Sequence, residues 1–159
     1  MTIRLTALVA ALTMAFAFAA GAQVPQYGAE VTLELAKKAI AAGQAEAKKN
    51  NWPVAIAVVD NHGFLVAYEK MDNTQTASVQ VAIDKAVSAA TYRRPTKVFQ
   101  DLVAGAGAGT RVLNLRGASS VEGGLPLVVG DKIIGGIGVS GVTSDQDGVV
   151  AKAGADALK

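Results

Sequence analysis

Apolar side chains recur along this chain at two spacings, and each spacing predicts one kind of secondary structure. Over residues 32–50 they return every three or four positions, which is typical of a helix with one buried face. Thr32 can cap this helix, and Glu34 lies in its first turn. The face that we expect to be buried consists of Leu33, Ala36, Ile40, Gly43 and Ala47.

Two pairs of short apolar runs predict β-hairpins. The run PVAIAVVD at residues 53–60 is apolar almost throughout, which indicates a strand covered on both faces or buried at a subunit contact. The turn Asp60-Asn61-His62-Gly63 joins it to a partner strand, FLVAYEKMD. A second hairpin is predicted where LPLVV and KIIGGIGVS flank Gly130-Asp131, a pair that favours positive φ.

Residues 76–92 return to helical spacing, and Pro95 ends this second helix. Asp84 and Lys85 lie near its middle. Its predicted apolar face consists of Val79, Ala82, Ile83, Ala86 and Ala90.

The rest of the chain is predicted to contain two shorter helices. Thr96 can cap one that runs to Leu102, after which GAGAGT at residues 105–110 is expected to be a flexible linker. Ser144 starts the last helix, with Asp147 as the partner in a shortened capping box.

The order is therefore helix, hairpin, one or two helices, hairpin, helix. Hairpins give antiparallel pairs, and the order lacks a repeated strand-helix-strand crossover. The sequence thus predicts an α+β fold in which an antiparallel β-sheet built from two hairpins carries flanking helices, a profilin-like layer architecture. Residues 23–159 are expected to form a single domain with one core.

The start of the chain has the features of a secretory signal peptide over residues 1–22. Arg4 precedes an apolar run from Leu5 to Ala20, and Ala20-Gly21-Ala22 supplies a cleavage site of small residues. This predicts a periplasmic or secreted protein with no membrane span after cleavage. A retained anchor is the alternative, because the apolar run approaches the roughly 20 residues that a span needs.

The composition excludes several classes of function. Without cysteine the chain has no disulfides, thiol catalysis, thiolate metal site or covalent haem attachment. Without Arg4, 14 basic and 13 acidic residues remain, and neither this balance nor any basic stripe points to nucleic acid. The chain has one histidine and no recognisable nucleophile-base pair, so we do not expect an enzyme with its own acid-base catalysis.

Residues 123–147 hold seven glycines in 25 positions, although glycine weakens a strand. Gly136-Ile-Gly138-Val-Ser140-Gly141 matches the dinucleotide-binding fingerprint, but the last helix needs the 18 residues that follow and leaves no room for the required parallel strand. Ser140 lacks the second glycine of a nucleophile elbow. We expect instead that Gly135, Gly136, Gly138 and Gly141 bare one face of the strand for a helix, a neighbouring subunit or a flat ligand.

Three segments together resemble the GlcG/HbpS family of haem-binding proteins, which also forms the C-terminal domain of PduO proteins. They are VVDNHGFLVAYEKMD, AIDKAVSAATYRRPT and GGLPLVVGDKIIGGIGVSGVTSDQDGVVAKAGADAL. The resemblance implies a compact α+β domain that often forms larger oligomers and holds haem non-covalently. Some exported members are linked to iron binding, haem breakdown and protection from oxidative stress, whereas others accompany glycolate or diol metabolism.

The family pattern maps onto Asp60, Gly63, Met71, Asp72, Lys85, Thr96, Gly123, Gly124, Pro126, Gly136, Gly138, Ser140, Gly141 and Asp147. This chain departs from it at NHG, where a small residue is usual before Gly63, and at KMDNT, where arginine and glycine are more typical. His62 therefore inherits no ligand role from the family.

The residues themselves offer few haem contacts. Candidate iron ligands are His62, Met71, Tyr68, Tyr92 and the hydroxyl of Thr96. Arg93 and Arg94 can pair with haem propionates or cap the helix end. An apolar slot is expected between helix and sheet or between subunits.

The leading hypothesis is an exported protein that scavenges, stores or buffers non-covalent haem, with any haem degradation driven by an oxidant at the iron. The alternative is a non-catalytic binding module for a small carboxylate metabolite or a corrinoid, held by Lys85, Arg93, Arg94 and glycine amides. The apolar run at residues 53–59 and the 51% hydrophobic content also predict a homo-oligomer.

Overall fold

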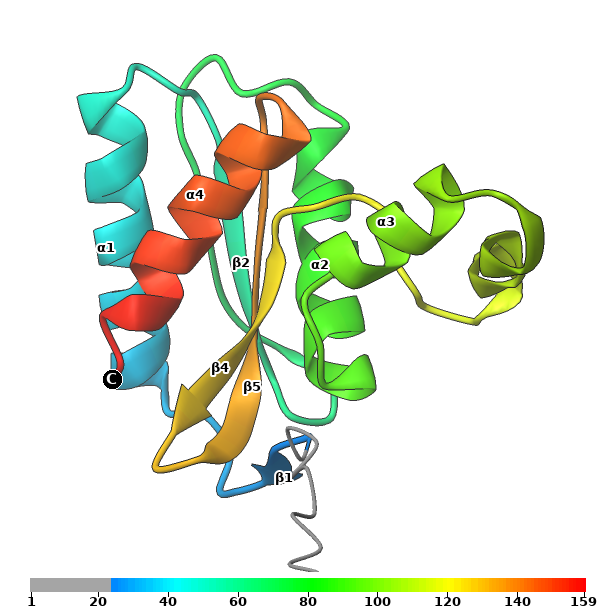
Figure 1. The fold of residues 1–159 in the computed structure, drawn as a ribbon. Coiled ribbons are helices and arrows are strands. Elements are labelled where there is room, and N and C mark those ends of the chain that lie inside the picture. Colours follow the sequence, from blue (N-terminus) through cyan, green and yellow to red (C-terminus); the bar gives the residue numbers. More distant parts are fainter. Residues whose placement is uncertain (1–23) are drawn as a thin grey trace, which may run out of the picture.

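The computed structural model describes residues 24–159, which form a mixed β-sheet with helices on both faces (Figure 1). Its strands are β1 (Gln26–Tyr27), β2 (Ala55–Asp60), β3 (Leu65–Lys70), β4 (Gly124–Val129) and β5 (Lys132–Ser140). Its helices are α1 (Leu33–Lys49), α2 (Ser78–Tyr92), α3 (Lys97–Ala104) and α4 (Ser144–Asp156), with the 3-10 helix η1 (Gly107–Asn114) after α3. The expected signal peptide, residues 1–22, lies outside the described residues. Among the helices that are described, none is long and apolar enough to cross a membrane.

The sheet is organised around β5, which pairs antiparallel with β4 on one side and with β2 on the other. β2 pairs in turn with β3, so both predicted hairpins are present. Gly130 and Asp131 have φ of 54° and 61°, the positive values of a type I′ turn. The sequence did not predict β1, which runs parallel to β5 beyond the point where β2 ends. The predicted α+β class is confirmed.

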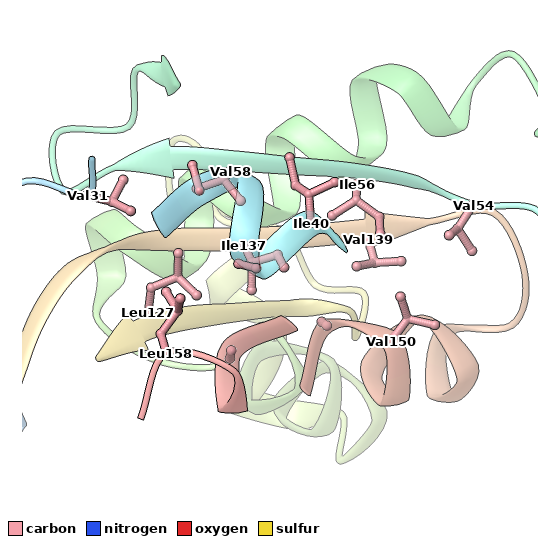
Figure 2. Close-up of a cluster of buried hydrophobic side chains, with 14 of the residues drawn as sticks. Val31, Ile40, Val54, Ile56, Val58, Leu127, Ile137, Val139, Val150 and Leu158 are labelled. Carbon is pink, nitrogen blue, oxygen red and sulfur yellow. The ribbon is translucent and has the colours of Figure 1, made fainter. Parts of the chain in front are cut away.

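Helices α1 and α4 cover one face of the sheet and form the larger core with it. Ile40 and Val150 come from the two helices, while Ile56 and Ile137 come from β2 and β5 (Figure 2). On the opposite face, α2 packs against the remaining side chains of β2. Because all of β2 except its last residue is buried within one chain, the apolar run at residues 53–59 is explained without a subunit contact.

Two of the four glycines expected on one face, Gly136 and Gly138, let α2 lie directly on the sheet, whereas Gly135 meets Val59 and Val31 and Gly141 meets Pro53. A Cβ added at Gly138 would lie 2.0 Å from the carbonyl oxygen of Ala82, and one at Gly136 would lie 2.4 Å from that of Ala86. Of the three partners that the sequence left open, a helix therefore occupies this face. The expected slot for a flat ligand between helix and sheet is absent here, because the two backbones are in contact.

Several predicted details at the helix ends need correction. Thr32 does cap α1, since its Oγ1 accepts a hydrogen bond from Leu35 N–H at 3.2 Å, but Leu33 is exposed because its side chain lies off the sheet-facing side. The expected linker at residues 105–110 is mostly helical, with η1 starting at Gly107. The last helix is capped by Thr143 with Gln146 as the capping-box partner, because Asp147 turns inward.

Candidate functional site

The most enclosed charged groups are Lys85 on α2 and Asp147 on α4. Lys85 Nζ lies 2.8 Å from Asp147 Oδ2, and the two side chains are 1% and 3% exposed. Nζ also donates to the carbonyl oxygen of Val139 on β5 at 2.9 Å. Asp147 Oδ1 accepts a hydrogen bond from Val142 N–H at 3.2 Å. The pair thus ties together α2, β5 and the start of α4 through groups that have left water.

Burial controls the titration of Asp147. Desolvation raises the pKa of its carboxyl above the usual range for aspartate, and this effect exceeds the lowering by Lys85 and by the backbone N–H groups of Val142 and Gly141. A neutral or shared-proton form is therefore easier to reach here than at the surface.

Three other signature residues, Gly123, Gly124 and Thr96, fit closely around this ion pair. Gly123 has a φ of +123°, and a Cβ on it would lie 2.8 Å from Lys85 Nζ. Gly124 N–H donates to Thr96 Oγ1 at 2.9 Å, and Thr96 N–H donates to the Gly124 carbonyl at 3.0 Å. The sequence predicts that Thr96 caps α3, but its side chain does not do so. Its hydroxyl instead accepts the hydrogen bond from the start of β4.

Ser140 and Gly141 complete this buried group. Ser140 Oγ donates to Ser78 Oγ at 3.0 Å, which joins the end of β5 to the start of α2. A Cβ on Gly141 would lie 2.2 Å from the Pro53 carbonyl oxygen. The gathered signature residues thus bind one another, and Lys85 has no face open to a ligand anion. This weakens the alternative of a carboxylate-binding module.

The sequence did not pair Lys85 with Asp147. The signal was the position of Lys85, three residues after Ala82 and one before Ala86 on the predicted buried face. A buried ammonium needs a carboxylate. The helix start after β5 supplied candidates, but periodicity could not say which acid turned inward.

A second group of residues lies at the end of the molecule formed by the β2–β3 turn, and two of them, His62 and Arg93, are candidates predicted from the sequence. We call this group, Tyr27, His62, Phe64, Leu65 and Arg93, the His62 end. His62 Nε2 lies 3.3 Å from Glu30 Oε1, and its side chain is 67% exposed. Phe64 is 72% exposed, and both Leu65 and Tyr27 are also exposed.

The C-terminus of α2 brings Arg93 to the same place. Tyr27 OH lies 3.0 Å from the carbonyl oxygens of Ala90 and Thr91, and the Arg93 guanidinium lies 5.5 Å from the centre of the Tyr27 ring. A Cβ on Gly63, next to His62, would lie 3.4 Å from Thr91 Cγ2. The His62 end therefore combines an exposed imidazole, exposed apolar side chains and a guanidinium that forms no ion pair within residues 24–159.

The guanidinium groups of Arg93 and Arg94 lie against different aromatic rings. The Arg94 guanidinium stacks on Phe99, 5.7 Å from the ring centre, and its Nε donates to the Tyr92 carbonyl at 3.1 Å. Tyr92 packs edge-on against Phe99, and its OH donates to the Arg116 carbonyl at 2.7 Å. Arg94 thus satisfies the end of α2, as the alternative interpretation predicted, while Arg93 faces Tyr27.

The remaining ligand candidates are separated from His62. Met71 follows the far end of β3, where its N–H donates to the Val54 carbonyl at 3.0 Å. A six-residue strand spans roughly 20 Å, so His62 and Met71 of one chain cannot bind the same iron. Tyr68 OH is buried without a hydrogen-bond partner, and desolvation raises its pKa, which disfavours a phenolate ligand. The described residues contain no cluster of three or more His, Asp or Glu side chains suited to a metal ion.

Comparisons with known proteins agree with this architecture. Protein GlcG of Escherichia coli strain K12 is 44% identical over 107 residues, which cover 67% of this chain and 78% of GlcG. A solved double mutant of Streptomyces reticuli HbpS has 29% identity and a TM-score of 0.76, covering 98% of this chain and 99% of that one. A structure described as a PduOC:heme complex has 25% identity and a TM-score of 0.73, covering 82% and 96%.

The sequence match includes every residue of the two buried clusters except Leu158. Residues 31–156 match the family model described as haem degrading protein HbpS-like. That range starts at the residue before the cap of α1 and ends with the last residue of α4. The chain belongs to the HbpS-like family.

Proposed function

We propose that this protein is exported, binds haem non-covalently, and scavenges, stores or buffers it. The observation that carries the proposal is membership of the HbpS-like family, whose model is described as haem degrading, together with a relative solved as a haem complex. The leader-like residues 1–22 support export to the periplasm or the medium.

The His62 end is where we place the haem. Its residues suit the group, because an imidazole can bind iron, exposed aromatic and aliphatic side chains can cover a porphyrin face, and Arg93 can pair with a propionate. Thr96 is less suitable, since its side chain is fully buried and its hydroxyl already accepts Gly124 N–H. Lys85 is equally enclosed by Asp147.

The bound iron would supply the redox chemistry of any haem breakdown. The protein residues at the His62 end would bind and orient the haem, with His62 at the metal and Arg93 at the carboxylate. Acid-base catalysis by the buried Lys85–Asp147 pair has no place in this proposal, because that pair has no path to the surface.

A titration of purified residues 23–159 with hemin tests both parts. We expect a saturable Soret shift at an equimolar ratio. His62→Ala should weaken binding by about tenfold or more, since removal of even an outer-shell partner of a metal ligand has that effect. Met71→Ala is the matched control, because it removes another candidate iron ligand at the opposite end of β3.

The possible outcomes distinguish failure of haem binding from a wrong assignment of the haem site. No saturable shift with the wild-type chain would reject haem binding. An unchanged titration with His62→Ala would reject the His62 end while leaving haem binding intact, and a loss confined to Met71→Ala would move the site to the other end of the sheet. Arg93→Gln should weaken binding by up to about fivefold, the value of a partly exposed charge pair.

A further inference from the structure

A cleft of about 450 Å³ runs along the outer side of α2, away from the sheet. Residues 117–121 form its second wall. It shares no residue with the His62 end. The lining residues are Val81, Asp84, Val87, Gly117, Ala118, Ser119 and Val121.

Hydrogen bonds fix the second wall in place. Before it, Tyr92 OH donates to the Arg116 carbonyl at 2.7 Å, and within it Ser119 N–H donates to Ser88 Oγ at 3.0 Å. After it, Glu122 N–H donates to Gln100 Oε1 at 2.8 Å. The cleft is therefore formed before any ligand arrives, and binding need not bear the cost of ordering the loop.

The cleft has apolar walls and one charged group. Val81, Val87 and Val121 supply side-chain surface, and Asp84 supplies a carboxylate. Gln80 Nε2 donates to Asp84 Oδ1 at 2.8 Å, which holds the carboxylate without neutralising it. Among residues 24–159, no lysine, arginine or histidine forms an ion pair with Asp84. The cleft is thus complementary to a cation with a hydrocarbon body and opposed to an anion.

We propose that this cleft binds a small organic amine whose ammonium group pairs with Asp84 and whose hydrocarbon part lies against the three valines. The volume is within the range of small-molecule sites, about 300–1,000 Å³. Haem suits this cleft less well, because no lysine, arginine or histidine lines it to pair with a propionate. The proposal does not depend on haem binding, and its test needs no haem.

The test uses n-alkylamines of increasing length, with n-alkanols of the same lengths as neutral partners. Binding is followed by amide chemical-shift changes in ¹⁵N-labelled residues 23–159. We expect saturable shifts at Gly117, Ala118 and Ser119. Affinity should rise by about fourfold per added methylene until the cleft is filled, which is the transfer free energy of a buried methylene expressed as a ratio. Each amine should bind about two to five times more tightly than its alcohol, the gain of an exposed ion pair.

Two variants distinguish the contribution of the Asp84 carboxylate to binding from that of the apolar walls. Asp84→Asn should remove the preference for amine over alcohol and keep the dependence on chain length, whereas Val121→Ser should weaken amine and alcohol alike. Asp72→Asn is the matched control, because it removes one exposed carboxylate elsewhere and should leave the preference unchanged.

The proposal is overturned by any of three results. The first is shifts that do not saturate or that map away from residues 117–121. The second is an amine preference that survives in Asp84→Asn. The third is displacement of a bound alkylamine by equimolar hemin, which would make the cleft the haem site.

Discussion

Among single residues, Lys85 and Asp147 form the most deeply buried ion pair of the described chain. Both side chains have lost their hydration, and a buried pair repays that loss only when both partners are present. Lys85→Met should therefore lower the free energy of unfolding by about 3–5 kcal/mol at pH 7, because Asp147 would be left buried without its cation. Urea unfolding followed by the fluorescence of Trp52 measures this.

The double variant Lys85→Met with Asp147→Leu is the control for that prediction. It removes both charges and should recover most of the lost stability, since apolar residues of similar size often replace a buried ion pair at little cost. A single variant as stable as the wild type would show that the pair contributes nothing, and a double variant worse than the single would point to packing alone.

The raised pKa of Asp147 gives a prediction about pH. A carboxyl whose pKa is higher in the folded state binds protons more readily when folded, so its contribution to stability is complete below the unfolded pKa of about 3.9 and declines as pH rises through the higher folded value. From pH 4 upward, the unfolding free energy of the wild type should therefore fall relative to that of Asp147→Asn. Subtracting the variant cancels the other carboxylates. A difference that shifts in favour of the wild type would mean that Lys85 outweighs desolvation.

The sequence indicates which of these residues are distinctive but not which partners they bind. It marked Lys85, Thr96 and Asp147, yet assigned Thr96 and Asp147 to caps at helix starts. Both residue types favour such positions locally. In the structure, Thr96 binds Gly124 N–H, 28 residues away in sequence, and Asp147 binds Lys85 Nζ, 62 residues away. Local sequence does not indicate hydrogen-bond partners at such distances.

At the scale of elements, the contact of α2 with β5 depends on missing side chains. Gly138→Ala would place a Cβ against the Ala82 carbonyl, and since this is backbone, the helix itself must move. We expect a loss of about 3 kcal/mol or more in unfolding free energy, the upper range for overpacking. Thermal unfolding followed by far-UV circular dichroism measures it.

Gly105→Ala is the matched control for this glycine. Gly105 has a φ of −72°, and its Cβ would meet the Asp101 carbonyl at an ordinary 3.5 Å. We expect stability that is unchanged or higher by up to about 1 kcal/mol, since alanine restricts the unfolded chain more than glycine does. If Gly138→Ala and Gly105→Ala lost equal unfolding free energy, the contact between α2 and β5 at Gly138 would not be the cause of the loss.

The elements themselves were largely predictable. Both hairpins, α1, α2 and α4 follow from periodicity and turn residues, and the Gly130-Asp131 turn has the predicted backbone. The region after α3 was misjudged because its alternating glycines and alanines suggest flexibility, whereas η1 packs against α3. β1 was missed because two exposed residues give no period.

In the whole molecule, the surfaces available for assembly differ from the one that the sequence indicates. The apolar run in β2 no longer supports an oligomer, because α1, α4 and α2 cover that strand within one chain. A separate exposed apolar surface lies on the arm formed by residues 97–115, which contains α3 and η1 and stands off the sheet layers in Figure 1. It exposes Leu102, Leu113 and Leu115, with Leu113 63% exposed. Apolar side chains gathered on one exposed segment are a feature of subunit contacts.

We therefore expect residues 23–159 to form a homo-oligomer through this arm, and light scattering coupled to size exclusion measures it. Leu113→Glu combined with Leu115→Glu should raise the dissociation constant by about tenfold or more, because charges would enter the desolvated centre of the contact. Phe64→Glu is the control, since it places the same charge on an exposed apolar residue at the His62 end and should leave the mass unchanged. A monomeric wild-type chain would contradict the expectation directly. Loss of assembly with Phe64→Glu alone would instead place the contact over the proposed haem site, and haem would then be shared between subunits.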